Sequence, residues 1–161
     1  MATNLKNLSE YTLRNTGSVS DKQFGVVVSE WNDQITGALL EGALETLKEQ
    51  GVTKNKIKIH YVPGSFELPL GAQLLAQKKE FDAVICLGCV IQGETRHFDF
   101  ICDAVAQGIC NVGLKYNKPV VFGVLTTNTL QQALDRAGGK HGNKGEEAAI
   151  TAVKMLGFQN A

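Results

Sequence analysis

Four short apolar runs alternate along the chain with stretches in which apolar residues recur every three or four positions. Short apolar runs bounded by turn residues are typical of buried strands, and the longer spacing is typical of helices with one buried face. Strands are expected at Phe24–Ser29, Ile57–Val62, Ala83–Leu87 and Val120–Leu125. This alternation predicts an α/β fold, a three-layer α/β/α sandwich around a four-stranded parallel sheet.

The helical stretches add detail to this fold. Helices are expected before a C-cap at Gly51, from about Glu67 to Lys79, from Asp99 onward, over residues 129–136 and from near Gly145. In the second helix, Leu70, Leu74 and Leu75 are expected to face the core. The third helix is expected to bury one apolar stripe, formed by Phe98, Ile101, Cys102, Val105, Ile109 and Val112.

Length and charge limit the classes of partner. At 161 residues the chain is expected to form one domain, residues 23–161, behind an N-terminal segment of residues 1–22. Sixteen basic and sixteen acidic residues balance, which argues against nucleic acid or an anionic membrane as a partner. No apolar run approaches the roughly 20 residues of a membrane span, and residues 1–22 lack the apolar core of a signal peptide. A cytoplasmic protein with a small-molecule ligand is therefore expected.

Two of the four cysteines, Cys86 and Cys89, form a Cys-x-x-Cys pair. A redox pair of this spacing normally opens a helix, whereas Cys86 lies inside an expected strand. The spacing to Cys102 and Cys110 matches no common zinc pattern. The preferred interpretation is buried thiols that act as small apolar side chains, with a redox or zinc site as the alternative, and no metal site is expected.

The segment Gly93-Glu94-Thr95-Arg96-His97-Phe98-Asp99 follows the third strand and leads into a helix. In an α/β protein the carboxyl end of a parallel strand opens onto a helix N-terminus, whose free N–H groups favour an anion. Thr95 adds a hydroxyl, and His97 adds a group that exchanges protons near neutral pH. We therefore expect an anion site here with His97 as a candidate catalyst. A structural role for this histidine is the alternative.

Aromatic and polar residues also follow the first two strands. Trp31, the only tryptophan, offers a flat surface on which a planar heterocycle can stack, and Asn32 beside it can bond a polyol or an amide. The alternatives are a tryptophan that packs against a helix cap and an asparagine that caps the helix. After the second strand, Ser65 and Phe66 are expected to present backbone groups, and Glu67 is expected to accept hydrogen bonds from hydroxyls. Ordinary helix capping by Ser65 and Glu67 is the alternative.

Further candidates lie at the ends of the third and fourth strands. The backbone of Val90 and Ile91 is a candidate for contacting the edge of a heterocycle. Arg136 can pair with a phosphate through two parallel N–H groups, and Lys144 stands with Glu147 at a glycine-rich helix start. Surface salt bridges explain either cation equally well when it is taken alone.

In order along the chain, these motifs resemble those of one enzyme family. They are Trp31-Asn32, Pro63-Gly64-Ser65-Phe66-Glu67-Leu68-Pro69, Gly93-Glu94-Thr95-Arg96-His97-Phe98 and Arg136-Ala137-Gly138-Gly139-Lys140-His141-Gly142-Asn143-Lys144-Gly145. The resemblance is to 6,7-dimethyl-8-ribityllumazine synthase and extends from about Phe24 to Leu156. It implies the condensation of 5-amino-6-(D-ribitylamino)uracil with 3,4-dihydroxy-2-butanone 4-phosphate to 6,7-dimethyl-8-ribityllumazine, the penultimate step of riboflavin biosynthesis. Phosphate and water are released, and neither a metal nor an organic cofactor is implied.

The resemblance also implies roles for the candidate residues. It implies that Trp31 stacks on the pyrimidine ring and that Val90 and Ile91 contact this ring through their backbone. It implies contacts to the ribityl chain for Asn32, Ser65, Phe66 and Glu67. The phosphate is expected against Gly93, Glu94 and Thr95, with Arg136 opposite. His97 is implied as the proton-transfer residue, with Glu147 orienting it or tuning its charge.

The family places its active sites between adjacent subunits of a pentamer or of a sixty-subunit icosahedral shell. Lys144 and Phe122 are accordingly expected to act across a subunit boundary. The short loop between Arg136 and Lys144 favours the shell. The resemblance further implies riboflavin synthase as a partner, and residues 1–22 are expected to pair with a neighbouring subunit.

Two other functional classes stay open. A flavodoxin-like electron carrier would share the flavodoxin-like sheet predicted here, but it is expected to bring a phosphate-binding loop after its first strand. In this chain Ser29-Glu30-Trp31-Asn32-Asp33 has no glycine and two acidic residues, which opposes phosphate at that position. The second class is a catalytically silent flavin- or lumazine-binding carrier on the same fold. Retention of His97, Arg136 and Lys144 argues against such a carrier, and a turnover assay distinguishes it from the enzyme.

Overall fold

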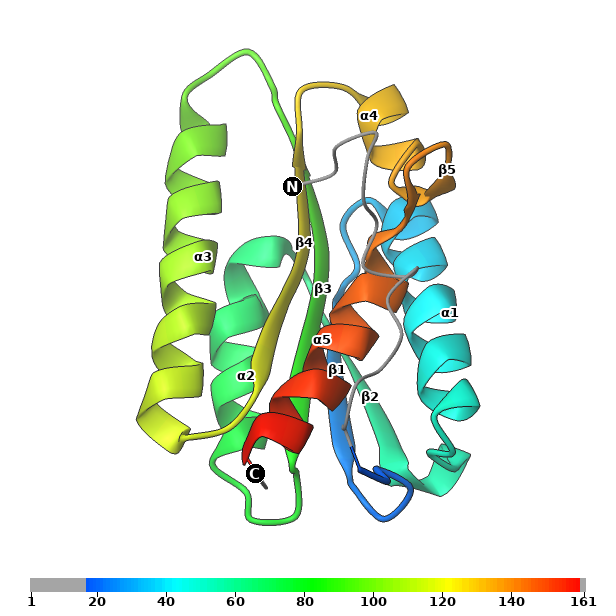
Figure 1. Ribbon diagram of the computed structural model, residues 1–161. Helices are drawn as coiled ribbons and strands as arrows, with labels where there is room; N and C mark the ends of the chain where they lie inside the picture. The colour runs from blue at the N-terminus through cyan, green and yellow to red at the C-terminus, as the bar shows by residue number, and fades with distance from the viewer. Residues whose placement is uncertain (1–16, 160–161) are drawn as a thin grey trace.

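A four-stranded parallel sheet forms the centre of the computed structural model, which describes residues 17–159 (Figure 1). The strands are β1 (Phe24–Ser29), β2 (Ile57–Val62), β3 (Ala83–Ile91) and β4 (Val120–Thr127). Their order is β2-β1-β3-β4, and every neighbouring pair is parallel. A short antiparallel pair, β5 (Ala137–Gly139) and β6 (Gly142–Asn143), lies outside this sheet.

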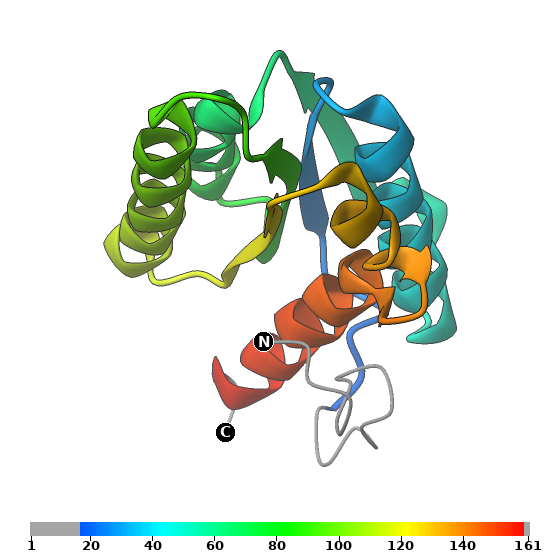
Figure 2. The same cartoon turned by 90° about the horizontal axis from the view of Figure 1, so that it is seen from above.

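Helices cover both faces of the sheet (Figure 2). One face carries α1 (Asp33–Glu49), α4 (Leu130–Leu134) and α5 (Lys144–Gln159), and the other carries α2 (Leu68–Ala76) and α3 (His97–Tyr116). Short 3-10 turns precede β2 and α2, at η2 (Lys54–Lys56) and η3 (Ser65–Glu67). Each face has its own buried apolar cluster against the sheet. The predicted three-layer α/β/α sandwich with a flavodoxin-like sheet is confirmed.

Burial along the strands follows their position in the sheet. All six residues of β1 are buried because this central strand is covered on both faces. In β2, at the edge, none is fully buried. β3 and β4 run past their expected ends at Leu87 and Leu125, because the last residues of the two strands pair with each other. β1 pairs with β3 only as far as Leu87, so the end of β3 has a strand on one side only.

Two expectations for the helices were wrong. α3 begins at His97 rather than Asp99, and the Oγ1 of Thr95 accepts a hydrogen bond from the His97 N–H at 3.4 Å. Leu70 and Leu74 do not face the core but are exposed, whereas Leu75 is buried as expected. These two leucines place an outward apolar strip on α2. In the expected stripe of α3, the last three residues are buried and the first three are half-buried, namely Phe98, Ile101 and Cys102.

Only part of the expected N-terminal segment lies within the described residues. Residues 1–16 lie outside them. Val19 is buried in the core cluster beside α1, and its carbonyl accepts a hydrogen bond from the Lys22 N–H at 3.1 Å. The Gln23 N–H donates to Oδ2 of Asp82 at 2.7 Å. The end of this segment therefore packs on the chain's own sheet. None of the helices between residues 17 and 159 has the length and hydropathy that a bilayer span requires.

The four cysteines are free thiols, and Cys86 and Cys89 are buried within β3, as expected. Burial raises the pKa of Cys86 to about 12 and that of Cys89 to about 11. The thiolate, not the thiol, is the reactive species, so both side chains are chemically inert at neutral pH.

Native labelling with a thiol reagent tests this placement. At about pH 8, Cys86 and Cys89 should stay unmodified because neither is ionised or accessible. Both should react once the chain is unfolded in guanidinium. Peptide mass spectrometry locates the label, and modification of either residue in the native protein would contradict their burial in β3.

Candidate functional site

The carboxyl ends of the four parallel strands meet at one edge of the sheet, the upper edge in Figure 1. In open α/β sheets this edge is where ligands bind. The loops that follow β1, β2 and β3 carry most of the candidate residues. Val90 and Ile91 end β3, and His97 begins α3. The others are Arg136 after α4, Lys144 and Glu147 in the first turn of α5, and Phe122, which lies on β4 closer to its start than to this edge.

Two aromatic side chains stand exposed at this edge. Trp31, after β1, is 72% exposed, and Phe66, after β2, is 56% exposed. The backbone ties their loops together, because the Trp31 N–H donates to the Pro63 carbonyl at 3.2 Å and the Glu30 N–H donates to the Val62 carbonyl at 2.8 Å. Large apolar surface left in solvent marks a contact site. The alternative of a Trp31 that packs against its own chain does not fit this exposure.

Asn32 links the end of β1 to the end of β3. Its backbone is left-handed, with φ of 62°, and its carbonyl accepts hydrogen bonds from the N–H groups of Ile35 and Thr36 at 2.9 and 3.0 Å. Its side-chain Nδ2 donates to the Cys89 carbonyl at 2.9 Å. Asn32 is thus the N-cap residue of α1 through its backbone, but its side chain makes no capping hydrogen bond. Instead, it holds the Trp31 loop against the last residues of β3.

Ser65 and Glu67 differ in what their side chains do. Oε2 of Glu67 accepts a hydrogen bond from the Gly64 N–H at 3.1 Å, so Glu67 does contribute to capping. The Ser65 hydroxyl is buried and has no partner within the described part of the chain. A methyl group placed on Gly88 would come within 2.7 Å of this hydroxyl, which shows that it lies against β3. The Ser65 side chain therefore makes no capping hydrogen bond in the described part of the chain.

Gln92 shapes the loop between β3 and α3. Its Nε2 donates to the carbonyls of Gly93 and Thr95 at 2.8 and 3.3 Å, and its N–H donates to the Thr127 carbonyl at 2.8 Å. His97 begins α3 on the exposed side of the loop, and its ring has no hydrogen-bond partner among residues 17–159.

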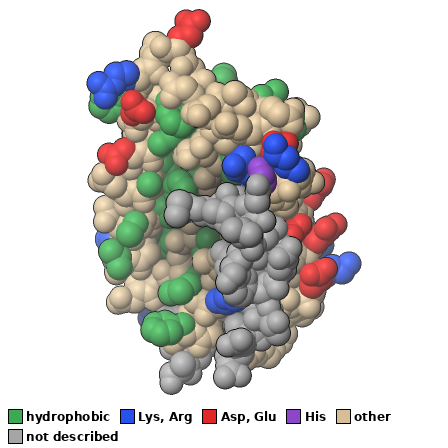
Figure 3. Space-filling view, turned by 45° about the horizontal axis from the view of Figure 1, so that its top comes forward, with side chains coloured by type: hydrophobic (Ala, Val, Ile, Leu, Met, Phe, Trp, Pro, Cys, Tyr) green, Lys and Arg blue, Asp and Glu red, His purple; other side chains and the backbone are tan. Residues whose placement is uncertain are grey.

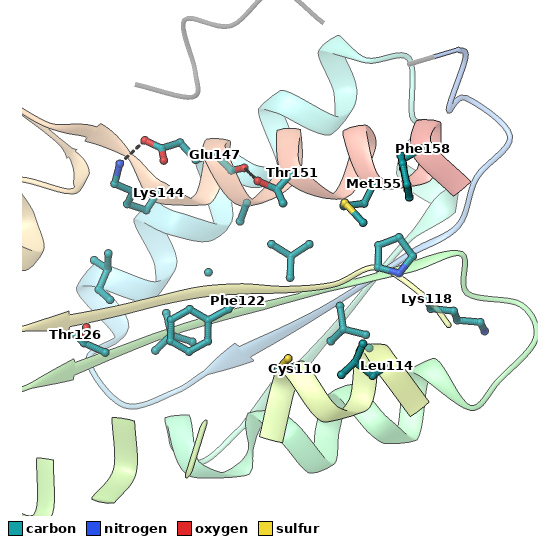
Figure 4. A pocket seen from close by; sticks show the side chains of 18 of the residues that line it. Cys110, Leu114, Lys118, Phe122, Thr126, Lys144, Glu147, Thr151, Met155 and Phe158 are labelled. Atoms are coloured by element: carbon teal, nitrogen blue, oxygen red, sulfur yellow. Dashed lines mark hydrogen bonds and ion pairs between the residues drawn. The ribbon is translucent and has the colours of Figure 1, made fainter. Parts of the chain in front are cut away.

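A cleft of about 1030 Å³ lies beside β4, between α3 and α5 (Figure 4). Of the candidate residues, Phe122, Arg136, Lys144 and Glu147 line it. Its other end is apolar and includes Leu114, Met155 and Phe158. None of the candidates on the loops after β1, β2 and β3 lines this cleft. Figure 3 shows hydrophobic side chains gathered along this side of the molecule, with lysine, arginine and histidine side chains close together beyond them.

The charges in the cleft are unevenly compensated. Lys144 and Glu147 form an ion pair whose side chains are only 18% and 13% exposed (Figure 4). Nη1 of Arg136 donates to the Gln132 carbonyl at 2.9 Å, and the guanidinium has no carboxylate partner within the described residues. The neighbouring Asp135 does not supply one. Its pKa is lowered, first by a hydrogen bond from Gln131 and then by Lys140, which lies 3.0 Å away. The guanidinium of Arg136 thus keeps N–H groups for an anion.

The candidate residues therefore fall into two groups within one chain. The strand-end group contains Trp31, Asn32, Ser65, Phe66, Glu67, Val90, Ile91, Gly93, Glu94, Thr95 and His97, and the cleft group contains Phe122, Arg136, Lys144 and Glu147. No hydrogen bond or ion pair links the two groups in the described part of the chain, and Glu147 engages Lys144 rather than His97. Two buried polar residues near the cleft escaped the sequence analysis, Thr127 and Asn143. A threonine at the end of a strand and an asparagine directly before an expected helix were the available signals.

Comparison with known proteins agrees with the motifs. The family model for 6,7-dimethyl-8-ribityllumazine synthase matches residues 21–160. A protein of that name from Cytophaga hutchinsonii is 65% identical over 151 residues, covering 94% of each chain. One from Parabacteroides distasonis is 54% identical over 158 residues, covering 98% of this chain and 99% of its own. One from Phocaeicola vulgatus is 50% identical over 159 residues. The resemblance seen in the motifs is confirmed, and the chain belongs to the 6,7-dimethyl-8-ribityllumazine synthase family.

Proposed function

We propose that the reaction takes place where the strand-end group of one copy meets the cleft group of a second copy. As a member of its family, the chain is an enzyme of riboflavin biosynthesis: it condenses 5-amino-6-(D-ribitylamino)uracil with 3,4-dihydroxy-2-butanone 4-phosphate to 6,7-dimethyl-8-ribityllumazine. The observation that carries the two-copy proposal is the separation of the two groups in one chain. The free His97 ring and the exposed Trp31 and Phe66 side chains support it.

The strand-end group would hold the pyrimidine substrate. Trp31 would stack on the ring, an offset contact worth about 0.5–1.5 kcal/mol beyond area burial. Asn32 already bonds the Cys89 carbonyl on the side of β3 that β1 leaves open. In a strand, backbone groups two residues apart point to the same side, so the N–H and carbonyl of Ile91 point the same way as those of Cys89. Ile91, next to Val90, would offer these groups to the edge of the ring. The backbone of Ser65 and Phe66 with the Glu67 carboxylate would bind the ribityl chain.

The phosphate of the second substrate would lie at the start of α3. Gly93, Glu94 and Thr95 precede that helix, whose N-terminal N–H groups favour an anion. Arg136 of the neighbouring copy would supply a charge-assisted contact from the guanidinium N–H groups that are not bonded to the Gln132 carbonyl. Lys144 and Phe122 of the same neighbouring cleft would complete the wall around the substrates.

The chemistry requires several proton transfers. The amine of the pyrimidine attacks the ketone and forms a Schiff base with loss of water, phosphate leaves by elimination, and the ring closes with loss of a second water. We assign these transfers to His97, which stands beside the proposed phosphate position. Glu147 would act across the boundary between copies, where it would orient the His97 ring or adjust its charge. Glu147 would stay paired with Lys144. Holding both substrates in contact would supply much of the remaining acceleration.

Assembly into homo-oligomers follows from this proposal, because a single chain lacks half of each site. The exposed Leu70 and Leu74 on α2 provide apolar surface for subunit contacts. The loop from Arg136 to Lys144 is short and is compatible with a sixty-subunit shell built from pentamers. Pairing of residues 1–16 with a neighbouring subunit, a cytoplasmic location and association with riboflavin synthase stay predictions.

Turnover tests the proposed function directly. Purified protein mixed with both substrates should form the lumazine, followed by its absorbance and fluorescence. His97→Ala should lower kcat by about 10²-fold, because a positioned proton donor is lost while substrate binding remains. The matched control is His60→Ala on the exposed edge strand β2, which should stay within about twofold of the unmodified protein.

One result would contradict this function. A protein without turnover that still binds a ribitylated pyrimidine would be the silent carrier. Binding is measured through quenching of Trp31, the only tryptophan in the chain. Equal losses in the His97 and His60 variants would remove the special role of His97.

Ser65→Ala separates a backbone role from a hydroxyl role. The unpartnered hydroxyl is buried against β3, so its removal should leave kcat/KM within about twofold and raise stability by up to about 1 kcal/mol. Glu67→Gln, which alters a side chain assigned to the ribityl chain, should weaken binding of the pyrimidine substrate. Steady-state kinetics and thermal unfolding give both values. A loss in Ser65→Ala as large as that in Glu67→Gln would show that the substrate uses the hydroxyl.

A further inference from the structure

We propose that Asn143 is a positioning residue that sets the direction of the Lys144 and Glu147 side chains by bridging α1 and the start of α5. This inference rests on the proposed roles of Lys144 and Glu147 in the cleft. Asn143 is the last residue before α5 and is only 7% exposed. It is therefore too buried to contact substrate itself.

Both ends of the Asn143 amide are occupied. Nδ2 donates to the Ala38 carbonyl in α1 at 2.8 Å, and Oδ1 accepts a hydrogen bond from the Gly145 N–H at 2.8 Å. The second bond caps one of the free N–H groups at the start of α5. The first reaches 105 residues back along the chain. One planar side chain thus connects two helices and defines their relative position at this point.

Glycines on both sides make room for this bridge. A methyl group on Gly42 would lie 2.6 Å from the Asn143 amide. A methyl group on Gly145 would overlap the Leu39 carbonyl oxygen, so the first turn of α5 packs directly on the backbone of α1. Backbone packed this closely leaves little freedom for the first turn of α5 to rotate.

The residues of the cleft group depend on this junction. Lys144 is the first residue of α5, Glu147 follows within the first turn, and both line the cleft as an ion pair (Figure 4). The Lys144 N–H also donates to the Arg136 carbonyl at 2.9 Å. A change in the position of this turn would therefore move Lys144 and Glu147 together and disturb Arg136. Shifts of about 1 Å at reacting groups can cost about 10²-fold in rate.

A double-mutant cycle distinguishes positioning from simple stabilisation. Asn143→Ala should lower kcat/KM by about tenfold or more at a temperature at which all variants are folded. In a Lys144→Met background the same change should cost clearly less than it does in the unmodified protein, because one of the two residues that it positions is already gone while Glu147 remains. The stability control is a substitution at a buried residue of α5 that does not line the cleft, either Val153→Ala or Leu156→Ala. Of these two, the one whose thermal midpoint matches that of Asn143→Ala is used. The matched control should stay within about twofold in kcat/KM.

Asn143→Asp tests the bridge itself. The aspartate keeps an acceptor for the Gly145 N–H but removes the donor to the Ala38 carbonyl. If the bridge to α1 matters, this variant should lose kcat/KM relative to the unmodified protein, because an acceptor replaces the donor opposite the Ala38 carbonyl. Full activity would show that the cap alone suffices and would overturn the bridging role.

The remaining outcomes separate this inference from the proposed function. Suppose that Lys144→Met lowers kcat/KM and that Asn143→Ala lowers it by the same factor in the Lys144→Met background as in the unmodified protein. The proposed function then stands, and the positioning role of Asn143 is overturned. The same holds if the matched control loses as much activity as Asn143→Ala. If Lys144→Met retains full activity, the proposed role of Lys144 fails, and this inference fails with it.

Discussion

The outer edge of β4 carries no further strand among residues 17–159, and this open edge determines how the functional residues are divided. α3 and α5 stand on opposite faces of the sheet, so the cleft opens along β4 between them. An edge strand presents unpaired N–H and carbonyl groups that a stable protein covers or pairs. The same opening exposes Phe122 and holds Arg136, Lys144 and Glu147 apart from the loops that carry Trp31 and His97. In the proposed shared site, a second copy of the chain covers this edge and supplies the strand-end group that the cleft lacks.

Residues at the site depart from the rules that the rest of the chain follows. The core residues of β1 and β3 are fully buried, whereas Trp31, Phe66 and Phe122 leave aromatic surface in solvent. Asn32 adopts a left-handed backbone, and the Ser65 and Thr127 hydroxyls are buried without partners in the described chain. Local departures of this kind are expected where function, rather than stability, selects the residue. Except for Phe122, which lies near the start of β4, these departures cluster at the carboxyl ends of the strands, in agreement with the enzymatic role of the family.

The sequence predicted the sheet and its order of elements because hydrophobic periodicity records burial directly. It misplaced Leu70 and Leu74, since apolar spacing shows that a face is buried but not whether the chain itself or another copy buries it. It placed the ends of β3 and β4 too early, because pairing between Val90–Ile91 and Thr126–Thr127 is a tertiary contact. The site residues came from motifs. The Cys89 partner of Asn32, the Ala38 partner of Asn143 and the Gly88 backbone beside the Ser65 hydroxyl lie far along the chain from these residues and carry no local signal.

Subunit complementation tests the shared site most directly. His97→Ala and Arg136→Ala chains, each nearly inactive alone, are coexpressed at equal levels and purified as mixed assemblies. Arg136→Ala chains keep a normal strand-end group, and His97→Ala chains keep a normal cleft group. Where these two meet, the site is intact, and random mixing in a ring places them together at about a quarter of the interfaces. The account predicts activity near that fraction of the unmodified enzyme. Activity no greater than the average of the two variants would contradict it and would show that each chain carries a complete site.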